Sequence, residues 1–188
     1  TEVLRQPNGQ GVNTLFALYF YTFEIYCDFS GYSDIAIGTA RILGITTQIN
    51  FNFPYFSRSI SEFWTRWHIS LSTWLRDYLF LPISYAVMRR IEGERFWKLK
   101  TAAWGYAGGM LSTMLLCGLW HGAGWNFIIW GLLHGVFLVF AFATKKIRRK
   151  AWKTLRLTRF PRLQTLFSIV FTFHLITLAW VFFHFKTL

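Results

Sequence analysis

Two histidines have neighbours that would let an imidazole take part in chemistry. The first, His121, occupies Gly118-Leu119-Trp120-His121-Gly122, at the end of a stretch without charged residues. Removal from water favours the neutral form of an imidazole, and a neutral imidazole can accept a proton from a hydroxyl group. The flanking glycines would let a substrate come close to the ring. A lone histidine in an apolar helix can equally serve as a hydrogen-bonding residue between helices, so both interpretations stay open at this point.

The second histidine, His68, lies in Arg66-Trp67-His68-Ile69-Ser70-Leu71-Ser72. It is predicted to lie on an amphipathic helix beside the apolar stripe, one turn before Ser72 and two turns before Arg76. A histidine with polar neighbours at these spacings could orient a substrate or a second histidine. The alternative is an interfacial histidine that contacts lipid headgroups.

No further catalytic motif is apparent. The sequence has no serine nucleophile elbow, phosphate-binding loop, H-E-x-x-H segment or dinucleotide fingerprint. Cys27 and Cys117 lie in apolar stretches without C-x-x-C spacing, so we expect packing residues and no metal site. The remaining histidines are expected to be structural or interfacial: His134, His174 and His184.

The elements that must position these residues are predicted to lie in a membrane. The 188 residues are 54% hydrophobic and 21% aromatic, above the roughly 45 to 50% apolar content of soluble domains. The net charge is +12, and the cations gather mainly in two blocks, Arg89 to Lys100 and Lys145 to Arg162. These cations do not alternate with aromatic residues as in a nucleic-acid groove, so we expect no nucleic-acid partner. They are typical of cytoplasmic loops under the positive-inside rule.

Helix lengths support this interpretation. The 43 residues from Ala102 to Thr144 contain no Asp, Glu, Lys or Arg, and as a helix they would extend about 65 Å, or two crossings of a bilayer core of about 30 Å. The natural turn is Gly122-Ala123-Gly124, which would return the chain to its starting side and place both basic blocks on one face. Further spans are predicted from about Val12 to Phe29 and from about Leu163 to Phe185. Glycine pairs with the spacing that allows close helix packing are Gly105 and Gly109, Gly118 and Gly122, and Gly131 and Gly135.

The first span is unusual because it carries acids. Glu24 and Asp28 share one helical face, and Ser30-Gly31-Tyr32-Ser33-Asp34 then interrupts the apolar pattern. Acids at bilayer depth usually face a cavity or a partner. We therefore expect a broken or re-entrant helix that lines a polar cavity. The alternative is a short loop at the interface that contains these acids.

An interfacial helix is predicted to follow. Ser59-Ile60-Ser61-Glu62 has the form of a capping box, so a helix should begin there. Along this helix Arg58, Glu62 and Arg66 form a charged row. The apolar stripe comprises Phe63, Trp64, Trp67, Leu71, Trp74, Leu75 and Tyr78. We expect Leu79 to Met88 to enter the membrane, kinked at Pro82. Together these elements predict an all-α, polytopic transmembrane bundle with broken or re-entrant and interfacial helices.

Three segments resemble the membrane-bound O-acyltransferase family, and within it the bacterial branch that acts on alginate and teichoic acids. The first is Tyr26-Cys27-Asp28-Phe29-Ser30-Gly31-Tyr32-Ser33-Asp34. The second runs from Glu62 through Trp67-His68-Ile69-Ser70 to Arg76-Asp77-Tyr78. The third is Gly118-Leu119-Trp120-His121-Gly122, followed by Trp125 and Trp130-Gly131-Leu132-Leu133-His134-Gly135.

The resemblance implies helices around a central tunnel in the cytoplasmic (inner) membrane. It implies that His121 is the catalytic histidine and that His68 holds the second polar position of the same site. We expect His121 to act as general base towards an acceptor hydroxyl, or to carry the acyl group itself. Residues 1–188 would then be part of a catalytic core, with N-terminal helices and the C-terminal end of the whole protein absent. Supporting or substrate-binding residues are expected at Trp120, Trp67, Ser72, Arg76, Asp77, Asp28 and Asp34. From their charges, Arg76 and Asp77 are expected to pair with the acids of the first span and so hold the cavity open.

The implied reaction moves an acyl group, acetyl in the first instance, from a cytoplasmic thioester to a hydroxyl of an extracytoplasmic polysaccharide or cell-wall polymer. The donor would be acetyl-CoA or an acyl carrier, with no bound cofactor, and an extracytoplasmic acyl-transfer protein would be a partner. Two departures leave the polymer open: Ser84-Tyr85-Ala86-Val87 replaces a glycine-rich stretch, and His184 replaces an arginine. Alternatives are lysophospholipid acylation and a transporter or channel subunit in which Glu24, Asp28, Asp34 and the histidines form an ion path.

Overall fold

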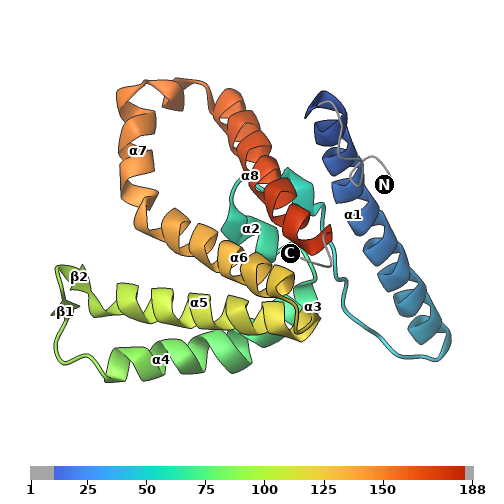
Figure 1. Ribbon diagram of the computed structural model, residues 1–188, viewed down its shortest axis with the longest axis horizontal. Helices are drawn as coiled ribbons and strands as arrows, with labels where there is room; N and C mark the ends of the chain where they lie inside the picture. The colour runs from blue at the N-terminus through green and yellow to red at the C-terminus, as the bar shows by residue number, and fades with distance from the viewer. Residues whose placement is uncertain (1–10, 185–188) are drawn as a thin grey trace.

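The fold is a set of helices joined by short connections, seen in a computed structural model that describes residues 11–184 (Figure 1). The long helices are α1 (Gly11–Ile42), α5 (Thr101–His121), α6 (Trp125–Ala143) and α8 (Pro161–His184). The shorter elements are η2 (Pro54–Phe56), α2 (Ile60–Trp64), α3 (Ile69–Leu75), the π-helical turn η3 (Arg76–Phe80), α4 (Leu81–Arg89), α7 (Lys145–Thr154) and η4 (Leu157–Arg159). A two-residue hairpin, β1 (Arg95–Phe96) with β2 (Leu99–Lys100), supplies the only sheet among the described residues.

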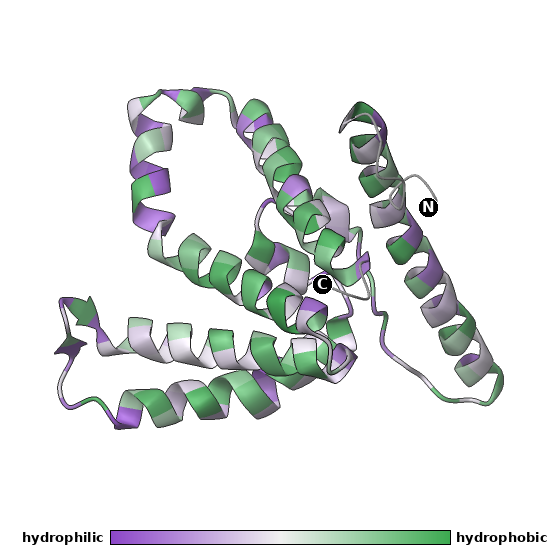
Figure 2. Cartoon of the chain, viewed as in Figure 1, coloured by the Kyte–Doolittle hydropathy of each residue, from purple (hydrophilic) through white to green (hydrophobic). Residues whose placement is uncertain are grey.

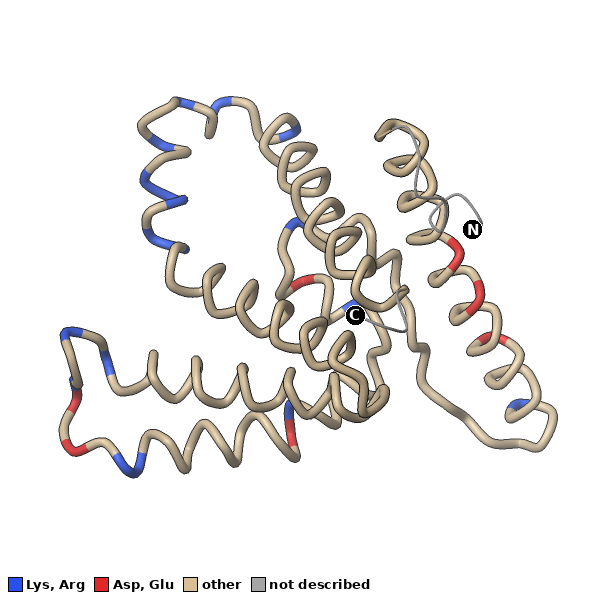
Figure 3. The backbone as a smooth tube through the Cα atoms, in the orientation of Figure 1, with Lys and Arg blue, Asp and Glu red and all other residues tan. Residues whose placement is uncertain are grey.

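Three helices within residues 11–184 are long and apolar enough to cross a membrane: α5, α6 and α8 (Figure 2). The expected division into two candidate spans is confirmed, because α5 ends at His121 and α6 begins at Trp125 after the glycine turn. The final span is confirmed by α8, although Phe185 lies outside the described residues. Both basic blocks lie at the end of the α5–α6 pair remote from that turn (Figure 3).

Close packing of α5 on α6 depends on glycine. A Cβ on Gly118 would run into the carbonyl oxygen of Phe127, and a Cβ on Gly131 would run into that of Met114. The two backbones therefore touch, as the small-residue spacing predicts. On the other side of α5, Gly109 faces Ser84 of α4. These contacts fix α5, whose last residue is His121.

The predicted break in the first span is wrong, because α1 continues as one helix of 32 residues through Ser30 to Asp34. The hydroxyl of Ser30 donates to the carbonyl oxygen of Cys27 at 3.4 Å, so this polar side chain is accommodated by the helix backbone. Ser33 is buried and Asp34 is exposed. α1 carries Glu24, Asp28 and Asp34 and is not among the three candidate spans.

The predicted helix start at Ser59 is confirmed. The Ser59 hydroxyl accepts from the backbone N–H of Glu62 at 3.1 Å, and the Glu62 carboxylate accepts from the backbone N–H of Arg58 at 2.8 Å. Arg66 contacts the same carboxylate at 2.8 Å, so the charged row is formed.

A single helix from this start through residue 78 was the wrong expectation, since α2 ends at Trp64 and α3 begins at Ile69. The loop that precedes α2 explains the break. The backbone N–H of Ile69 donates to the carbonyl oxygen of Asn50 at 3.0 Å, so it does not make the i−4 bond that a continuous helix needs. Arg66 is held similarly, its carbonyl oxygen accepting from the N–H of Asn52 at 3.0 Å.

The core is aromatic and lies where α2, α6 and α8 meet. Phe63, Trp130 and Trp180 are each at most 2% exposed, and the indole rings of Trp130 and Trp180 stack at 5.9 Å. α1 joins this core through the Tyr55 hydroxyl, which donates to the carbonyl oxygen of Thr22 at 2.6 Å. A second tie is the bond between the Tyr19 hydroxyl and Nε2 of His174 at 2.7 Å.

Candidate active site

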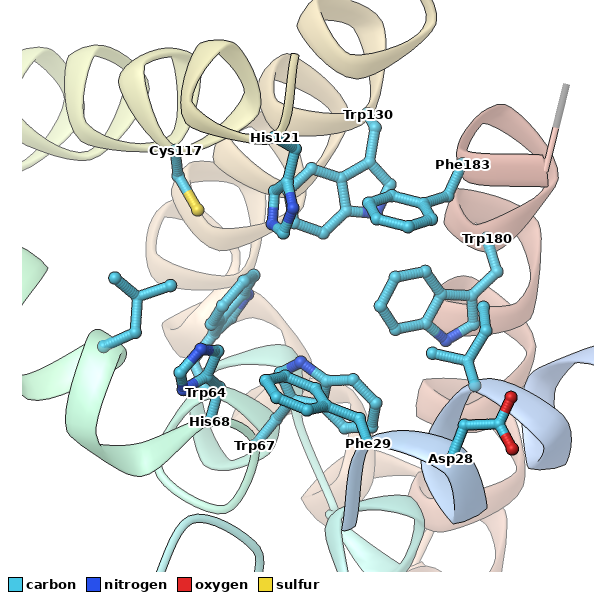
Figure 4. Close-up of a pocket in the computed structure, with 12 residues that line it drawn as sticks. Asp28, Phe29, Trp64, Trp67, His68, Cys117, His121, Trp130, Trp180 and Phe183 are labelled. Atoms are coloured by element: carbon cyan, nitrogen blue, oxygen red, sulfur yellow. The ribbon is translucent and has the colours of Figure 1, made fainter. Parts of the chain in front are cut away.

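A cavity of about 380 Å³ lies between α1, the α2–α3 segment, α5, α6 and α8. It brings together His68 and His121, which are far apart in the sequence, on facing walls (Figure 4). The other lining residues are Ile25, Asp28, Phe29, Trp64, Trp67, Leu71, Cys117, Trp130, Trp180 and Phe183. The lining is therefore almost entirely apolar, with two imidazoles, one carboxylate and one thiol.

His121 is half-buried at the end of α5. Its ring lies edge-on to Trp130, with centroids 5.0 Å apart, and to Phe183 at 5.1 Å. No residue within 11–184 hydrogen-bonds to its ring nitrogens. Aromatic walls thus hold the ring in place while the nitrogens stay available to a ligand.

His68 holds an unusual backbone conformation, with φ 43°, in the left-handed region, directly before α3. For a residue with a side chain this costs about 1–3 kcal/mol, and such strain persists where the surroundings fix it and gathers at functional sites. The surroundings here are Phe29, whose ring is edge-on to the imidazole at 4.7 Å, and Ser70, whose hydroxyl lies 3.5 Å from Nδ1. Burial lowers the pKa of His68 below its ordinary value, so the ring is neutral at neutral pH.

Asn50 braces the turn that presents His68. Its Oδ1 accepts from the hydroxyl of Ser70 at 2.6 Å and from the backbone N–H of Ser70 at 3.1 Å. Because the Ser70 hydroxyl donates to Asn50, it can only accept from the imidazole. Asn50 was not predicted as a site residue, since it lies 18 positions before His68 and only the fold brings them together.

The expected supporting residues divide into two groups. Trp67 and Asp28 line the cavity, and Ser72 supports Trp67 by donating to its carbonyl oxygen at 2.9 Å. Trp120 is 64% exposed and does not line the cavity, although its ring touches that of His121 at 4.8 Å. Asp34 is exposed on α1 away from the cavity.

The expected pairing of Arg76 with the acids of α1 is wrong. Arg76 Nε contacts Oδ1 of Asp77 at 2.7 Å, and both side chains are exposed. Hydrogen bonding to Arg76 lowers the pKa of Asp77. The guanidinium of Arg76 thus pairs with the carboxylate of Asp77 on the same helical turn and not with an acid of α1.

Some cavity residues were missed. Trp64 and Cys117 carried a usable signal, since Trp64 is on the apolar stripe of α2 and Cys117 is one helical turn before His121. No sequence pattern indicates Trp180, because its position at the cavity depends on how α8 packs against the other helices. The indole nitrogens of Trp64 and Trp130 are buried without a hydrogen-bond partner among the described residues. His134 is fully buried outside the cavity lining, packed between Phe63 and Trp64.

Comparison with known proteins gives a consistent result. The family model of MBOAT, the membrane-bound O-acyltransferase family, matches residues 11–185. A probable alginate O-acetylase of Azotobacter vinelandii is 43% identical over 89% of this chain and 29% of its own length. A peptidoglycan O-acetyltransferase of Helicobacter pylori is 41% identical over 89% of the chain and 28% of its own length. A teichoic acid D-alanyltransferase of Bacillus subtilis is 34% identical over 88% of the chain and 39% of its own length. The chain thus spans less than half the length of each of these relatives.

Proposed function

Since this chain belongs to the membrane-bound O-acyltransferase family, we propose that it forms part of the catalytic core of an enzyme that transfers a short acyl group to a hydroxyl of an extracytoplasmic polymer. The observation that carries the proposal is the meeting of His68 and His121 in one apolar cavity. The relatives named above act on alginate, peptidoglycan or teichoic acid by their names. A polysaccharide or cell-wall polymer is therefore the proposed acceptor.

In the proposed reaction His121 acts as general base. A ring nitrogen takes the proton of the acceptor hydroxyl while the hydroxyl oxygen attacks the carbonyl carbon of a thioester. The carbon–sulfur bond then breaks, and the departing thiolate takes the proton back from the imidazolium. A positioned base contributes about 10² to 10⁴ in rate. His68, neutral and braced by Ser70, positions the acceptor on the opposite wall.

The proposed donor is acetyl-CoA or an acyl carrier that approaches from the cytoplasmic side. The two basic blocks at one end of the α5–α6 pair support this orientation, since cytoplasmic loops are enriched in Lys and Arg. The acceptor would come from the opposite side of the inner membrane, with the help of an extracytoplasmic acyl-transfer partner. Helices of the whole protein, some of them re-entrant, would complete a tunnel around the cavity.

A transporter or channel is less well supported. An ion path needs consecutive polar groups, yet of the three acids of α1 only Asp28 lines the cavity with the histidines. Glu24 and Asp34 lie outside it.

The test is acyl transfer by the purified full-length protein in proteoliposomes. Radiolabelled acetyl-CoA is supplied with alginate, with cell-wall polymer or with a lysophospholipid as acceptor. We expect label in the polymer that depends on His121. Label in the lysophospholipid alone would reassign the substrate, and uptake of ions without any acyl transfer would support the transporter.

A further inference from the structure

An exposed residue and a buried one line the active-site cavity on opposite sides. Asp28 is exposed on α1. Cys117 is 1% exposed and Trp64 is 8% exposed, and both line the cavity away from Asp28. Figure 4 shows Cys117 and Asp28 on opposite sides of the cavity. A ligand that enters past Asp28 therefore reaches Cys117 last.

Cys117 shares a wall with the proposed base. It precedes His121 by one helical turn on α5, and its thiol points into the cavity (Figure 4). The next residue, Gly118, lies against the backbone of Phe127 on α6, so α5 cannot move closer to α6 at this point. The size of the side chain at position 117 therefore decides how much room remains beyond His121.

The walls beside Cys117 are apolar. Trp64 and Leu71 line the cavity together with Cys117. A small apolar group fits this combination of thiol, indole ring and leucine. The methyl group of an acetyl chain has this chemistry.

We propose that Cys117 limits the length of the acyl group that the enzyme transfers, by closing the cavity beyond His121. The inference rests on the proposed acyl transfer and names the residue that selects among donors. Discrimination against one extra methylene in an apolar pocket is about 10- to 200-fold. Removal of the sulfur in Cys117→Ala makes room for roughly one more heavy atom, whereas Cys117→Leu removes room.

The test compares acetyl-CoA with propionyl-CoA as donors for the full-length enzyme. We expect Cys117→Ala to raise the propionyl-to-acetyl rate ratio about tenfold and Cys117→Leu to lower acetyl transfer. The matched control is Cys27→Ala, because Cys27 is an exposed cysteine on α1 outside the cavity and should leave the ratio unchanged. An active Cys117→Ala variant with the wild-type ratio would overturn the inference. A wild type inactive with both donors would instead remove its premise, the acyl transfer itself.

A second measurement needs no variant. Methyl methanethiosulfonate is a small thiol reagent, and mass spectrometry can follow its addition to each cysteine in the native protein. We expect acetyl-CoA to slow modification of Cys117 several-fold without changing that of Cys27. Equal modification of Cys117 with and without acetyl-CoA, in an enzyme that turns this donor over, would contradict its position at the end of the acyl pocket.

Discussion

Asn50 and Ser70 are joined by two hydrogen bonds through one oxygen, with the Asn50 Oδ1 accepting from the Ser70 hydroxyl at 2.6 Å and from its backbone N–H at 3.1 Å. This pair holds the start of α3, where His68 adopts its left-handed conformation. The strained backbone of His68 is thus held by Asn50, a loop residue that lies 20 positions before Ser70 in the sequence.

We therefore predict that Asn50→Ala lowers acyl transfer about tenfold without loss of membrane insertion, since a small displacement of a positioned group can cost up to 10²-fold in rate. Asn50→Asp keeps an acceptor oxygen and should recover most of the rate. The control is Asn52→Ala, because within residues 11–184 only the backbone of Asn52 is hydrogen-bonded. Transfer rates of the full-length variants decide this, and equal rates for the two alanine variants would remove the positioning role of Asn50.

His121→Ala should lower transfer by about 10² to 10⁴, the usual contribution of a general base. Expression and insertion should stay normal, because the ring is half-buried and no described residue hydrogen-bonds to it. His174→Gln is the matched control, since His174 binds Tyr19 outside the cavity. Single-turnover transfer from labelled acetyl-CoA measures both variants. Wild-type rates in a well-inserted His121→Ala protein would refute the assignment.

His68→Ala is expected to give a smaller loss, about tenfold, as a neutral imidazole positions the acceptor and does not move its proton. The loss should appear mainly in the KM for the polymer. His68→Asn keeps a polar group and tolerates the left-handed conformation, so it should retain more activity than His68→Ala. Steady-state kinetics with varied polymer test this, and a KM equal to wild type in both variants would reduce His68 to a packing residue.

The local features of the fold were predictable from the sequence, and the non-local ones were not. The turn at Gly122 to Gly124 and the helix start at Ser59 follow from backbone propensity and capping, which act over a few residues. The break before His68 depends on Asn50, which a helical pattern cannot reveal. The uninterrupted α1 was missed because Ser30 satisfies its hydroxyl within the helix, so a polar residue there marks no loop.

The same division holds for the site. Sequence motifs predicted His68 and His121 as site residues, and the fold brings them to one cavity. Trp180 lines the same cavity from α8, yet no spacing relates it to either histidine. The predicted pairing of Arg76 with the acids of the first span was wrong, because the charges in a sequence do not show whether Arg76 pairs with the adjacent Asp77 or with a distant acid.

Gly131→Ala should destabilise the α5–α6 pair by about 1–3 kcal/mol, the cost of inserting a methyl group where no space exists. The added Cβ would meet the carbonyl oxygen of Met114, which is backbone and cannot turn aside. Gly38→Ala is the control, because no described residue places an atom within 4 Å of its Cβ position, and alanine there should stabilise α1 slightly. Thermal unfolding in detergent compares them, and a Gly131→Ala protein as stable as wild type would mean that the helices do not touch.

Glu62 gives a prediction about acid stability. Burial opposes ionisation of its carboxyl, but the backbone N–H of Arg58 and the charges of Arg66 and Arg58 outweigh burial and lower the pKa. A group whose pKa is lower in the folded protein contributes stability that is fully present above its unfolded pKa of about 4.3. That contribution is lost as the pH falls through the folded pKa. Thermal unfolding from pH 7 to pH 3 should therefore show a fall in Tm at the acid end that is smaller in Glu62→Gln, which keeps an acceptor for the Arg58 N–H without the charge. Identical acid profiles for the two proteins would show that the ion pairs of Glu62 with Arg58 and Arg66 do not stabilise the folded state.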